Sequence, residues 1–178
     1  LKKSDYIIAS SPDLRDQCNF ISKKNNAYYI CASINTNRYI PIQKHNLNEI
    51  VSIGWTGTFS SRYYLETIFP ILKKLIKIRR FRLIVISDFD ISVSGIDVQS
   101  IKWKKESEIE DLSKIDIGIY PLIKEDWVSG KSGLKALQYM AMGIPVIASN
   151  IGNSKNIISN NINGFLVNNE KEWIESFI

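Results

Sequence analysis

The sequence predicts an α/β protein built on a doubly wound parallel β-sheet with helices on both faces. Three observations lead to this prediction. Apolar runs of strand length alternate, along the whole chain, with helix-length runs whose apolar residues recur every three or four positions. The strand-like runs are continuously apolar, which is typical of strands covered on both faces. Of the 178 residues, 44% are hydrophobic, which is enough for a packed core and excludes a disordered chain.

Residues 1–49 are expected to hold a small unit and a linker. The elements predicted in it are a strand over residues 6–9, a helix over 14–20 and a strand over 27–31. Ser11 is a suitable cap for this helix, and Pro12 suits its first turn. The stretch over residues 35–48 is polar, contains Pro41 and shows no sustained period, so it predicts a linker between two units.

The alternation restarts at residue 50 and predicts a larger unit. Its expected strands cover residues 50–53, 83–86, 98–103, 115–120, 146–148 and 164–167. Its expected helices cover residues 61–78, 106–114, 132–142 and 153–159, and a final helix reaches the end of the chain. The helix over 61–78 has a stripe of apolar residues on one face, formed by Leu65, Ile68, Leu72, Leu75 and Ile76.

The net charge of +5 depends on one short stretch of the chain. We call it the basic stretch, and its residues are Lys73, Lys74, Lys77, Arg79, Arg80 and Arg82. No aromatic residues alternate with basic ones along an expected strand, as they do in single-strand nucleic-acid binders. We interpret the basic stretch as a solvated helix end, with binding of an acidic polymer or nucleic acid as the alternative.

The cysteines, the single histidine and the hydropathy of the chain narrow the possible classes of protein further. Cys18 and Cys31 are too few for a disulfide framework and lack metal-ligand spacing, so we expect two buried packing residues in a reducing compartment. His45 lies in the linker and has no histidine partner for a metal or acid–base pair, and we expect no metal site. No apolar run reaches the roughly 18–20 residues of a membrane-spanning helix. We therefore expect a protein of the cytoplasm or of the cytoplasmic face of a membrane.

Ligands of an open parallel sheet bind beyond the carboxyl ends of its strands, so the loops that follow strands are the candidate sites. The first such loop is Gly54-Trp55-Thr56-Gly57-Thr58, whose glycines allow close backbone approach and whose hydroxyls can donate to phosphate or sugar oxygens. A tight turn capped by Ser60 or Ser61 is the alternative, and both interpretations can hold. Trp55 and Trp103 follow strands, and they either stack on a base or sugar or pack in the core or at its rim.

The second loop, Gly130-Lys131-Ser132-Gly133-Leu134-Lys135, is expected to open the helix over 132–142. Two lysines in a first helical turn oppose the helix macrodipole, so we expect an anion at this end. Lys131, Lys135 and Gln138 are spaced to share one helix face, and Leu134, Leu137 and Ala141 to share another. A solvated lysine face is the alternative. The third loop contains Glu125 and Asp126, which either accept hydrogen bonds from sugar hydroxyls or are solvated.

From residue 50 onward the sequence resembles the carboxyl-terminal, donor-binding domain of GT-B glycosyltransferases of the family 4 type, the glycosyl transferases group 1. The resemblance lies in residues 116–122, 130–149, 151–153 and 163–167. It implies a Rossmann-like sheet, with residues 50–178 as a nucleotide-sugar-binding domain truncated at its carboxyl end. Residues 1–49 then correspond to the tail of an amino-terminal acceptor domain and the interdomain linker. The chain is accordingly expected to be a fragment, inactive alone.

Two departures from the family pattern concern the site. The family usually has two glutamates eight positions apart, and Gly130 and Gln138 stand at these positions here. The family's basic pair on the first glycine loop is not evident, since only Arg62 follows that loop. The chain is similar to a subgroup in which lysines supply the charge that faces the diphosphate. Gln138 can still donate a hydrogen bond to a ribose hydroxyl.

The resemblance implies a hexosyltransferase of polysaccharide biosynthesis that moves a sugar, with retention, from a UDP- or GDP-sugar to a glycan or lipid-linked acceptor. Lys131 and Lys135 would stabilise the leaving diphosphate, without a cofactor or metal. The residues expected to bind the nucleotide sugar are Gly57, Thr58, Arg62, Trp103, Asp126, Gly130, Ser132, Gly133 and Gln138. No nucleic-acid partner is expected, and any peripheral membrane contact belongs to the missing domain. A non-catalytic Rossmann-like binding module is the alternative.

Overall fold

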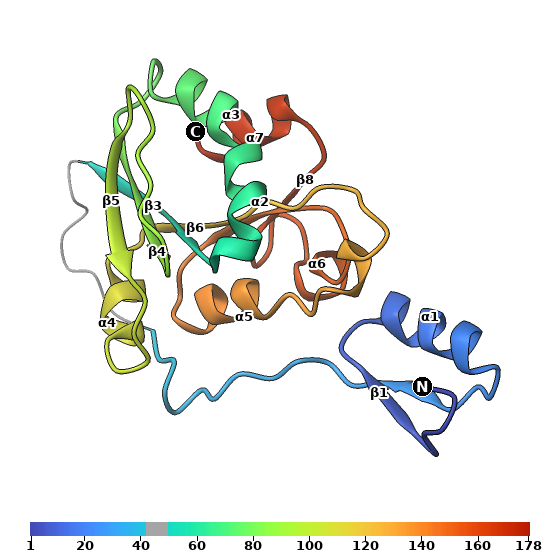
Figure 1. The fold of residues 1–178 in the computed structure, drawn as a ribbon. Coiled ribbons are helices and arrows are strands. Elements are labelled where there is room, and N and C mark those ends of the chain that lie inside the picture. The colour runs from blue at the N-terminus through green and yellow to red at the C-terminus, as the bar shows by residue number, and fades with distance from the viewer. Residues whose placement is uncertain (42–49) are drawn as a thin grey trace.

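The computed structural model describes residues 1–41 and 50–178, which form two parallel sheets (Figure 1). A two-stranded sheet pairs β1 with β2, and a six-stranded sheet has the order β5-β4-β3-β6-β7-β8. Residues 42–48 of the expected linker, which include His45, lie outside the described residues. The described helices are all too short or too polar to cross a bilayer.

The small unit consists of β1 (Ile7–Ala9), α1 (Pro12–Ser22) and β2 (Ala27–Tyr29). The Ser11 hydroxyl accepts a hydrogen bond from the Leu14 N–H at 3.0 Å, which confirms the predicted helix cap. Cys18 of α1 is buried in a small core under this sheet. Cys31 is exposed, so the prediction that both cysteines are buried is wrong. The reason is that β2 ends at Tyr29, which leaves Cys31 on the segment beyond it. We call residues 30–41, which form no helix or strand, the connector.

The larger unit contains the predicted doubly wound sheet. Its strands are β3 (Val51–Thr56), β4 (Phe81–Ser87), β5 (Asp97–Lys102), β6 (Ile117–Tyr120), β7 (Val146–Ser149) and β8 (Phe165–Val167). From β3 the chain winds outward through β4 and β5, and it returns to the other side of β3 with β6. The strand order thus reverses between β3 and β6, which is where open α/β sheets bind ligands.

Helices cover both faces of this sheet. They are η1 (Phe59–Ser61), α2 (Arg62–Thr67), α3 (Phe69–Leu75), α4 (Glu108–Ser113), η2 (Val128–Gly130), α5 (Leu134–Ala141), α6 (Ser154–Ile157) and α7 (Glu170–Ser176). One core cluster joins Leu65 of α2, Leu72 of α3 and Trp173 of α7. A second cluster joins Leu112 of α4 to Tyr139 of α5. The prediction of a sheet covered on both faces is confirmed.

Three local predictions are wrong. The helix expected over 61–78 is interrupted at Ile68, because Pro70 lacks an N–H and its ring crowds the preceding turn. The helix expected from residue 132 begins at Leu134, because Gly133 adopts a left-handed φ of 78°. The glycine turn begins later than expected, because β3 continues to Thr56 and Gly54 lies inside it. A Cβ on Gly54 would meet the Ile115 side chain at 2.3 Å, so close packing explains this glycine.

The basic stretch lies where α3 leads into the start of β4, at the edge of the sheet opposite to the carboxyl ends of the strands. All of its side chains are exposed, and Arg82 pairs with Asp97 at 2.8 Å. This agrees with the interpretation of a solvated helix end.

Candidate functional site

Two cavities lie along the carboxyl edge of the six-stranded sheet. We call the first the α5 pocket; it has a volume of about 400 Å³ and lies beyond β3, β4 and β5. It is lined by Thr56, Gly57, Thr58, Ser60, Ser61, Ile86, Trp103, Glu108, Leu112, Lys131, Lys135 and Gln138. We call the second the α1 cleft; it has a volume of about 810 Å³ and lies between α1 and the loops that follow β6 and β7.

The structure brings six of the predicted site residues together in the α5 pocket. They are Gly57, Thr58, Trp103, Lys131, Lys135 and Gln138. They come from the loop after β3, the segment after β5, and the segment that leads into and forms α5. Residues more than seventy positions apart in the sequence thus share one cavity, as the switch point between β3 and β6 predicts.

Lys135 is held against the end of β3. Its ammonium group donates a hydrogen bond to the backbone carbonyl of Thr56 and lies 4.8 Å from the centroid of the Trp55 ring. Trp55 itself is buried, so of the two interpretations given for it, packing in the core is the correct one. Burial, and in second place repulsion from Lys131, lower the pKa of Lys135 to about 8.

Lys131 reaches the same pocket from outside the helix. It has an extended backbone after η2, and its ammonium group lies 4.9 Å from the Tyr64 ring centroid and 4.7 Å from that of Trp127. Burial lowers its pKa as well. Within residues 1–41 and 50–178, no carboxylate forms an ion pair with Lys131 or Lys135. Two positive charges therefore face the pocket without an opposite charge from the described protein.

The loop after β3 presents hydroxyl groups to the pocket. The Gly57 N–H donates to the Ile86 carbonyl at 3.1 Å, and the Thr58 N–H donates to the Ser61 hydroxyl at 3.0 Å. Both backbone N–H groups are thus occupied within the protein. The hydroxyls of Thr58 and Ser60, 2.9 Å apart, remain as the groups with which this loop can bind a ligand oxygen.

Gln138 lies on the pocket side of α5, as its spacing from Lys135 predicts. Its amide Nε2 donates to the Tyr39 hydroxyl at 2.9 Å and to Glu108 Oε1 at 3.3 Å. Ala136 and Tyr139 form the buried face of α5, whereas Leu134, which was expected to share a second face with Leu137 and Ala141, is 41% exposed. The shifted helix start and the close packing of the Tyr139 ring against Gly118 select this face.

Five predicted residues lie outside the α5 pocket. Arg62 donates to Glu66 at 2.7 Å and lies over the Phe89 ring. Gly130, Ser132 and Gly133 line neither cavity and lie on the segment that leads from η2 into α5. Asp126 lines the α1 cleft.

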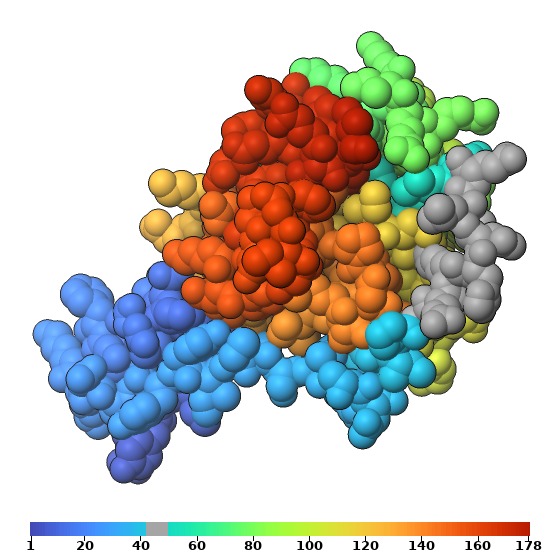
Figure 2. Space-filling model, turned by 180° about the vertical axis from the view of Figure 1, so that it is seen from behind, coloured from blue at the N-terminus to red at the C-terminus, as the bar shows by residue number. Residues whose placement is uncertain are grey.

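Six residues of the α5 pocket were not among the predicted binding residues. Thr56, Ser60 and Ser61 belong to the first loop and its cap, whereas Ile86, Glu108 and Leu112 come from segments that the sequence did not single out. Glu108 begins α4 and accepts hydrogen bonds from Arg38 and Tyr39 of the connector, from Trp103 and from Gln138. Its position five residues after Trp103 was the one available signal, because it follows the carboxyl end of an expected strand. Figure 2 shows the connector running along the surface from the small unit toward the larger unit.

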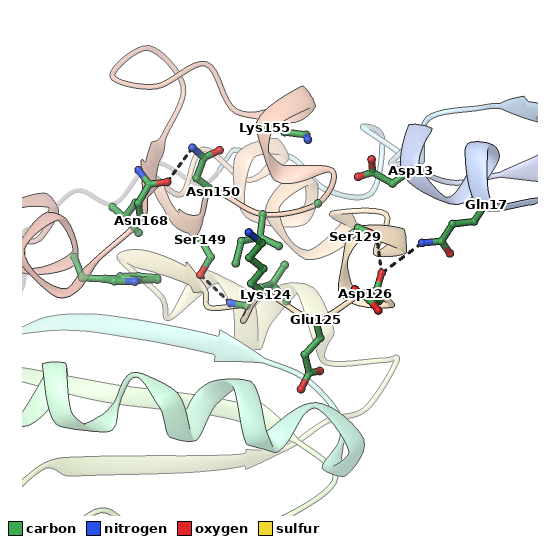
Figure 3. Close-up of a pocket in the computed structure, with 15 residues that line it drawn as sticks. Asp13, Gln17, Lys124, Glu125, Asp126, Ser129, Ser149, Asn150, Lys155 and Asn168 are labelled. Carbon is green, nitrogen blue, oxygen red and sulfur yellow. Dashed lines mark hydrogen bonds between the residues drawn. The ribbon is translucent and has the colours of Figure 1, made fainter. Parts of the chain in front are cut away.

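The α1 cleft combines the small unit with the larger one (Figure 3). Asp13 and Gln17 come from α1, and the Gln17 amide donates to the Asp126 backbone carbonyl at 3.5 Å. The opposite wall carries polar side chains of the segment from β6 into η2 and of the segment from β7 into α6. They are Lys124, Glu125, Asp126, Ser129, Asn150 and Lys155. The segment over residues 124–131 borders both cavities, which are therefore neighbours. Among the described residues, no group of three or more His, Cys, Asp or Glu side chains is suited to hold a metal ion.

Comparison with solved structures places this fold among the GT-B glycosyltransferases. The chain is similar to sucrose-phosphate synthase of Thermosynechococcus elongatus, with 19% identity and a TM-score of 0.75 over 99% of this chain and 49% of that one. It is also similar to a glycosyltransferase of Rickettsia africae ESF-5, with 20% identity and a TM-score of 0.76 over 97% of this chain and 52% of that one. HepE of Anabaena, solved in complex with UDP and glucose, has 14% identity and a TM-score of 0.68, over 97% of this chain and 52% of that one.

The family follows from the sequence itself. Residues 51–178 match the family model described as glycosyl transferases group 1, and the chain belongs to this family. No curated protein matches the sequence significantly. The chain spans about half the length of the first two structures described above.

Proposed function

We propose that this chain carries the donor site of a glycosyltransferase, and that the α5 pocket holds the diphosphate of a UDP- or GDP-sugar. The observation that carries the proposal is the pair Lys131 and Lys135, whose charges face the pocket without a carboxylate partner in the described chain. The Thr58 and Ser60 hydroxyls lie on the same cavity, suited to phosphate oxygens. Ile86 and Leu112 add apolar surface for a base.

The two lysines would act on the leaving group. Breaking the bond between the sugar and the diphosphate builds negative charge on the diphosphate oxygens in the transition state. Fixed positive groups in a partly desolvated pocket stabilise this charge without transferring a proton. In this role Lys131 and Lys135 are the catalytic residues, and Gln138 and Trp103 contact the nucleoside.

The α1 cleft is suited to the other substrate, a glycan or lipid-linked acceptor. It adjoins the α5 pocket through residues 124–131, and its polar side chains match a ligand with many hydroxyls. Asp126 belongs to this cleft rather than to the nucleotide site. We further propose that residues 1–41 belong to an acceptor domain and that residues 50–178 form the donor domain of a cytoplasmic, retaining hexosyltransferase of polysaccharide biosynthesis.

On its own the chain should bind a donor but not transfer the sugar. Positioning an acceptor against the anomeric carbon contributes roughly 7–11 kcal/mol to lowering such a barrier. The solved relatives have about twice the length of this chain, and the additional part is available there for that task. Transfer by the 178-residue chain at about 1 per second or faster would contradict this.

Titration calorimetry with UDP and GDP tests the donor site. Wild-type protein should bind at least one of them, and Lys135→Gln should weaken this binding strongly without loss of the folded state. Lys77→Gln is the matched control, because Lys77 is an exposed lysine of the basic stretch at the opposite edge of the sheet. If Lys77→Gln weakens binding and Lys135→Gln does not, the ligand binds at the basic stretch and the proposal is wrong.

A nucleotide-sugar-binding module without transfer is the second candidate. It is favoured by one observation, the presence of Gly130 and Gln138 where the family usually has two glutamates. The two candidates differ in donor turnover, because a transferase releases the nucleoside diphosphate once an acceptor is bound, whereas a module leaves the donor intact.

A further inference from the structure

We infer that Glu108 is the residue that binds the ribose hydroxyls of the nucleotide in the α5 pocket. The inference rests on the proposed donor site and adds to it a residue that distinguishes ribonucleotides from nucleotides that lack the ribose hydroxyls. It depends on three features of Glu108: its place relative to the lysines, the way its carboxylate is held, and the difference between its two oxygens.

The charges of the α5 pocket are arranged in order along α5. Lys135 lies near the start of the helix, and Gln138 follows three positions later, a rise of about 4.5 Å. Gln138 in turn contacts Glu108, which is the one carboxylate among the described residues that line the pocket. A nucleoside diphosphate has the same order of chemistry, with anionic phosphates followed by a neutral diol. Lysines bind the phosphates through opposite charge. A carboxylate, which only accepts hydrogen bonds, binds the hydroxyls of the diol.

The carboxylate is held in place before any ligand binds. Oε2 accepts from the Tyr39 hydroxyl at 2.7 Å and from Arg38 Nη2 at 3.1 Å. Both donors come from the connector, and neither lines the pocket. A carboxylate fixed in this way loses little further side-chain freedom when it binds a ligand.

The second oxygen faces the residues that line the pocket. Oε1 accepts from Trp103 Nε1 at 3.2 Å and from Gln138 Nε2 at 3.3 Å, contacts that are longer than those of Oε2. Trp103 is 47% exposed, so its indole N–H can turn to water when another donor takes its place. A ribose hydroxyl that donates to Oε1 makes a charge-assisted bond in a position that the pocket shields from part of the solvent.

Glu108 also anchors the connector, and this structural role uses Oε2. The test must therefore separate ribose binding from anchoring. We compare UDP with 2′,3′-dideoxy-UDP, which keeps the base and the diphosphate but lacks both ribose hydroxyls. Wild-type protein should bind UDP about 10- to 100-fold more tightly than the dideoxy compound.

Glu108→Gln should bring this ratio close to one by weakening UDP alone. Glu110→Gln is the control, since Glu110 is an exposed carboxylate of the same helix and lines neither cavity. Tyr39→Phe removes a donor to Oε2 and should keep the ratio. Lys135→Gln should weaken both nucleotides equally.

Three outcomes would overturn the inference. Glu108→Gln that keeps the ratio, or weakens both nucleotides equally, would make Glu108 a structural anchor only while leaving the donor site intact. Equal binding of UDP and dideoxy-UDP by wild-type protein would also exclude ribose recognition by Glu108. This measurement needs no variant, so it tests the inference even if Glu108→Gln does not fold. Absence of binding of both UDP and GDP by wild-type protein would refute the proposed donor site and this inference together. If the protein binds GDP alone, the same comparison is made with GDP and its 2′,3′-dideoxy analogue.

Discussion

Lys135 donates a hydrogen bond from its ammonium group to the backbone carbonyl of Thr56, the last residue of β3. The contact joins the first turn of α5 to the carboxyl end of the strand at which the order of the sheet reverses. It holds a charged group in a partly buried position, where its pKa is about 8. We therefore expect both the affinity for a diphosphate and the stability of the free protein to depend on this group.

The first prediction concerns the pH dependence of nucleotide binding. A bound diphosphate raises the pKa of Lys135, so binding near pH 8 takes up a proton. UDP is fully ionised above about pH 7, and Lys135 loses its charge as the pH rises through about 8. Affinity for UDP should therefore fall, by up to about tenfold, between pH 7 and pH 9. Calorimetry in buffers of different ionisation enthalpy measures both the affinity for UDP and the number of protons taken up on binding.

Lys135→Gln serves as the control, because without this ammonium group the residual affinity should depend less on pH over this range. An affinity of the wild-type protein that is constant from pH 7 to pH 9 would show that Lys135 does not face the ligand.

The second prediction concerns the stability of the unliganded protein. Because the pKa of Lys135 is lowered on folding, the unfolded state holds this proton between about pH 8 and pH 10.5 and the folded state does not. Stability should rise with pH through this window, and the charged lysine destabilises the fold at pH 7. Lys135→Met should raise the free energy of unfolding at pH 7 by about 1–3 kcal/mol at most. The gain is reduced by the loss of the hydrogen bond to the Thr56 carbonyl. Urea denaturation measures the change, and a loss of more than about 1 kcal/mol would contradict it.

The third prediction concerns Gln138→Glu. By sequence alone this change looks harmless, since Gln138 shares a face with the lysines. In the structure its amide donates to Glu108 Oε1 at 3.3 Å, so a carboxylate there meets a like charge. We expect Gln138→Glu to destabilise the protein by about 1–3 kcal/mol and the double change Glu108→Gln with Gln138→Glu to recover most of it. A double-mutant cycle by urea denaturation checks this, and strict additivity would contradict the contact.

The fourth prediction compares two glycines of the predicted site. A Cβ on Gly57 would meet the Trp55 ring at 2.1 Å and the Ser61 hydroxyl at 2.6 Å, whereas one on Gly130 would meet nothing closer than 3.7 Å. Gly57→Ala should destabilise the protein by about 1–3 kcal/mol, and Gly130→Ala should change its stability by less than about 0.5 kcal/mol. Thermal unfolding of both variants measures the difference. Equal effects would mean that the loop after β3 is packed differently.

The fold could be predicted from the sequence because its signals are local. The cap at Ser11 and the apolar runs of β4 and β7 each depend on a few neighbouring residues. Boundaries set by a single backbone conformation were missed, as at Gly133, whose left-handed φ decides where α5 begins. The site was predicted in part for the same reason, since Lys135 and Gln138 belong to one helix. Glu108 joins them through hydrogen bonds with Arg38 of the connector and with Gln138, contacts between residues far apart in sequence that periodicity does not report.

The most direct test of the central claim is a crystal structure of the chain with UDP bound. We predict that the diphosphate lies in the α5 pocket, with its oxygens within hydrogen-bond distance of the ammonium groups of Lys131 and Lys135 and of the Thr58 or Ser60 hydroxyl. Density for the diphosphate in the α1 cleft or at the basic stretch, with the α5 pocket empty, would contradict the account.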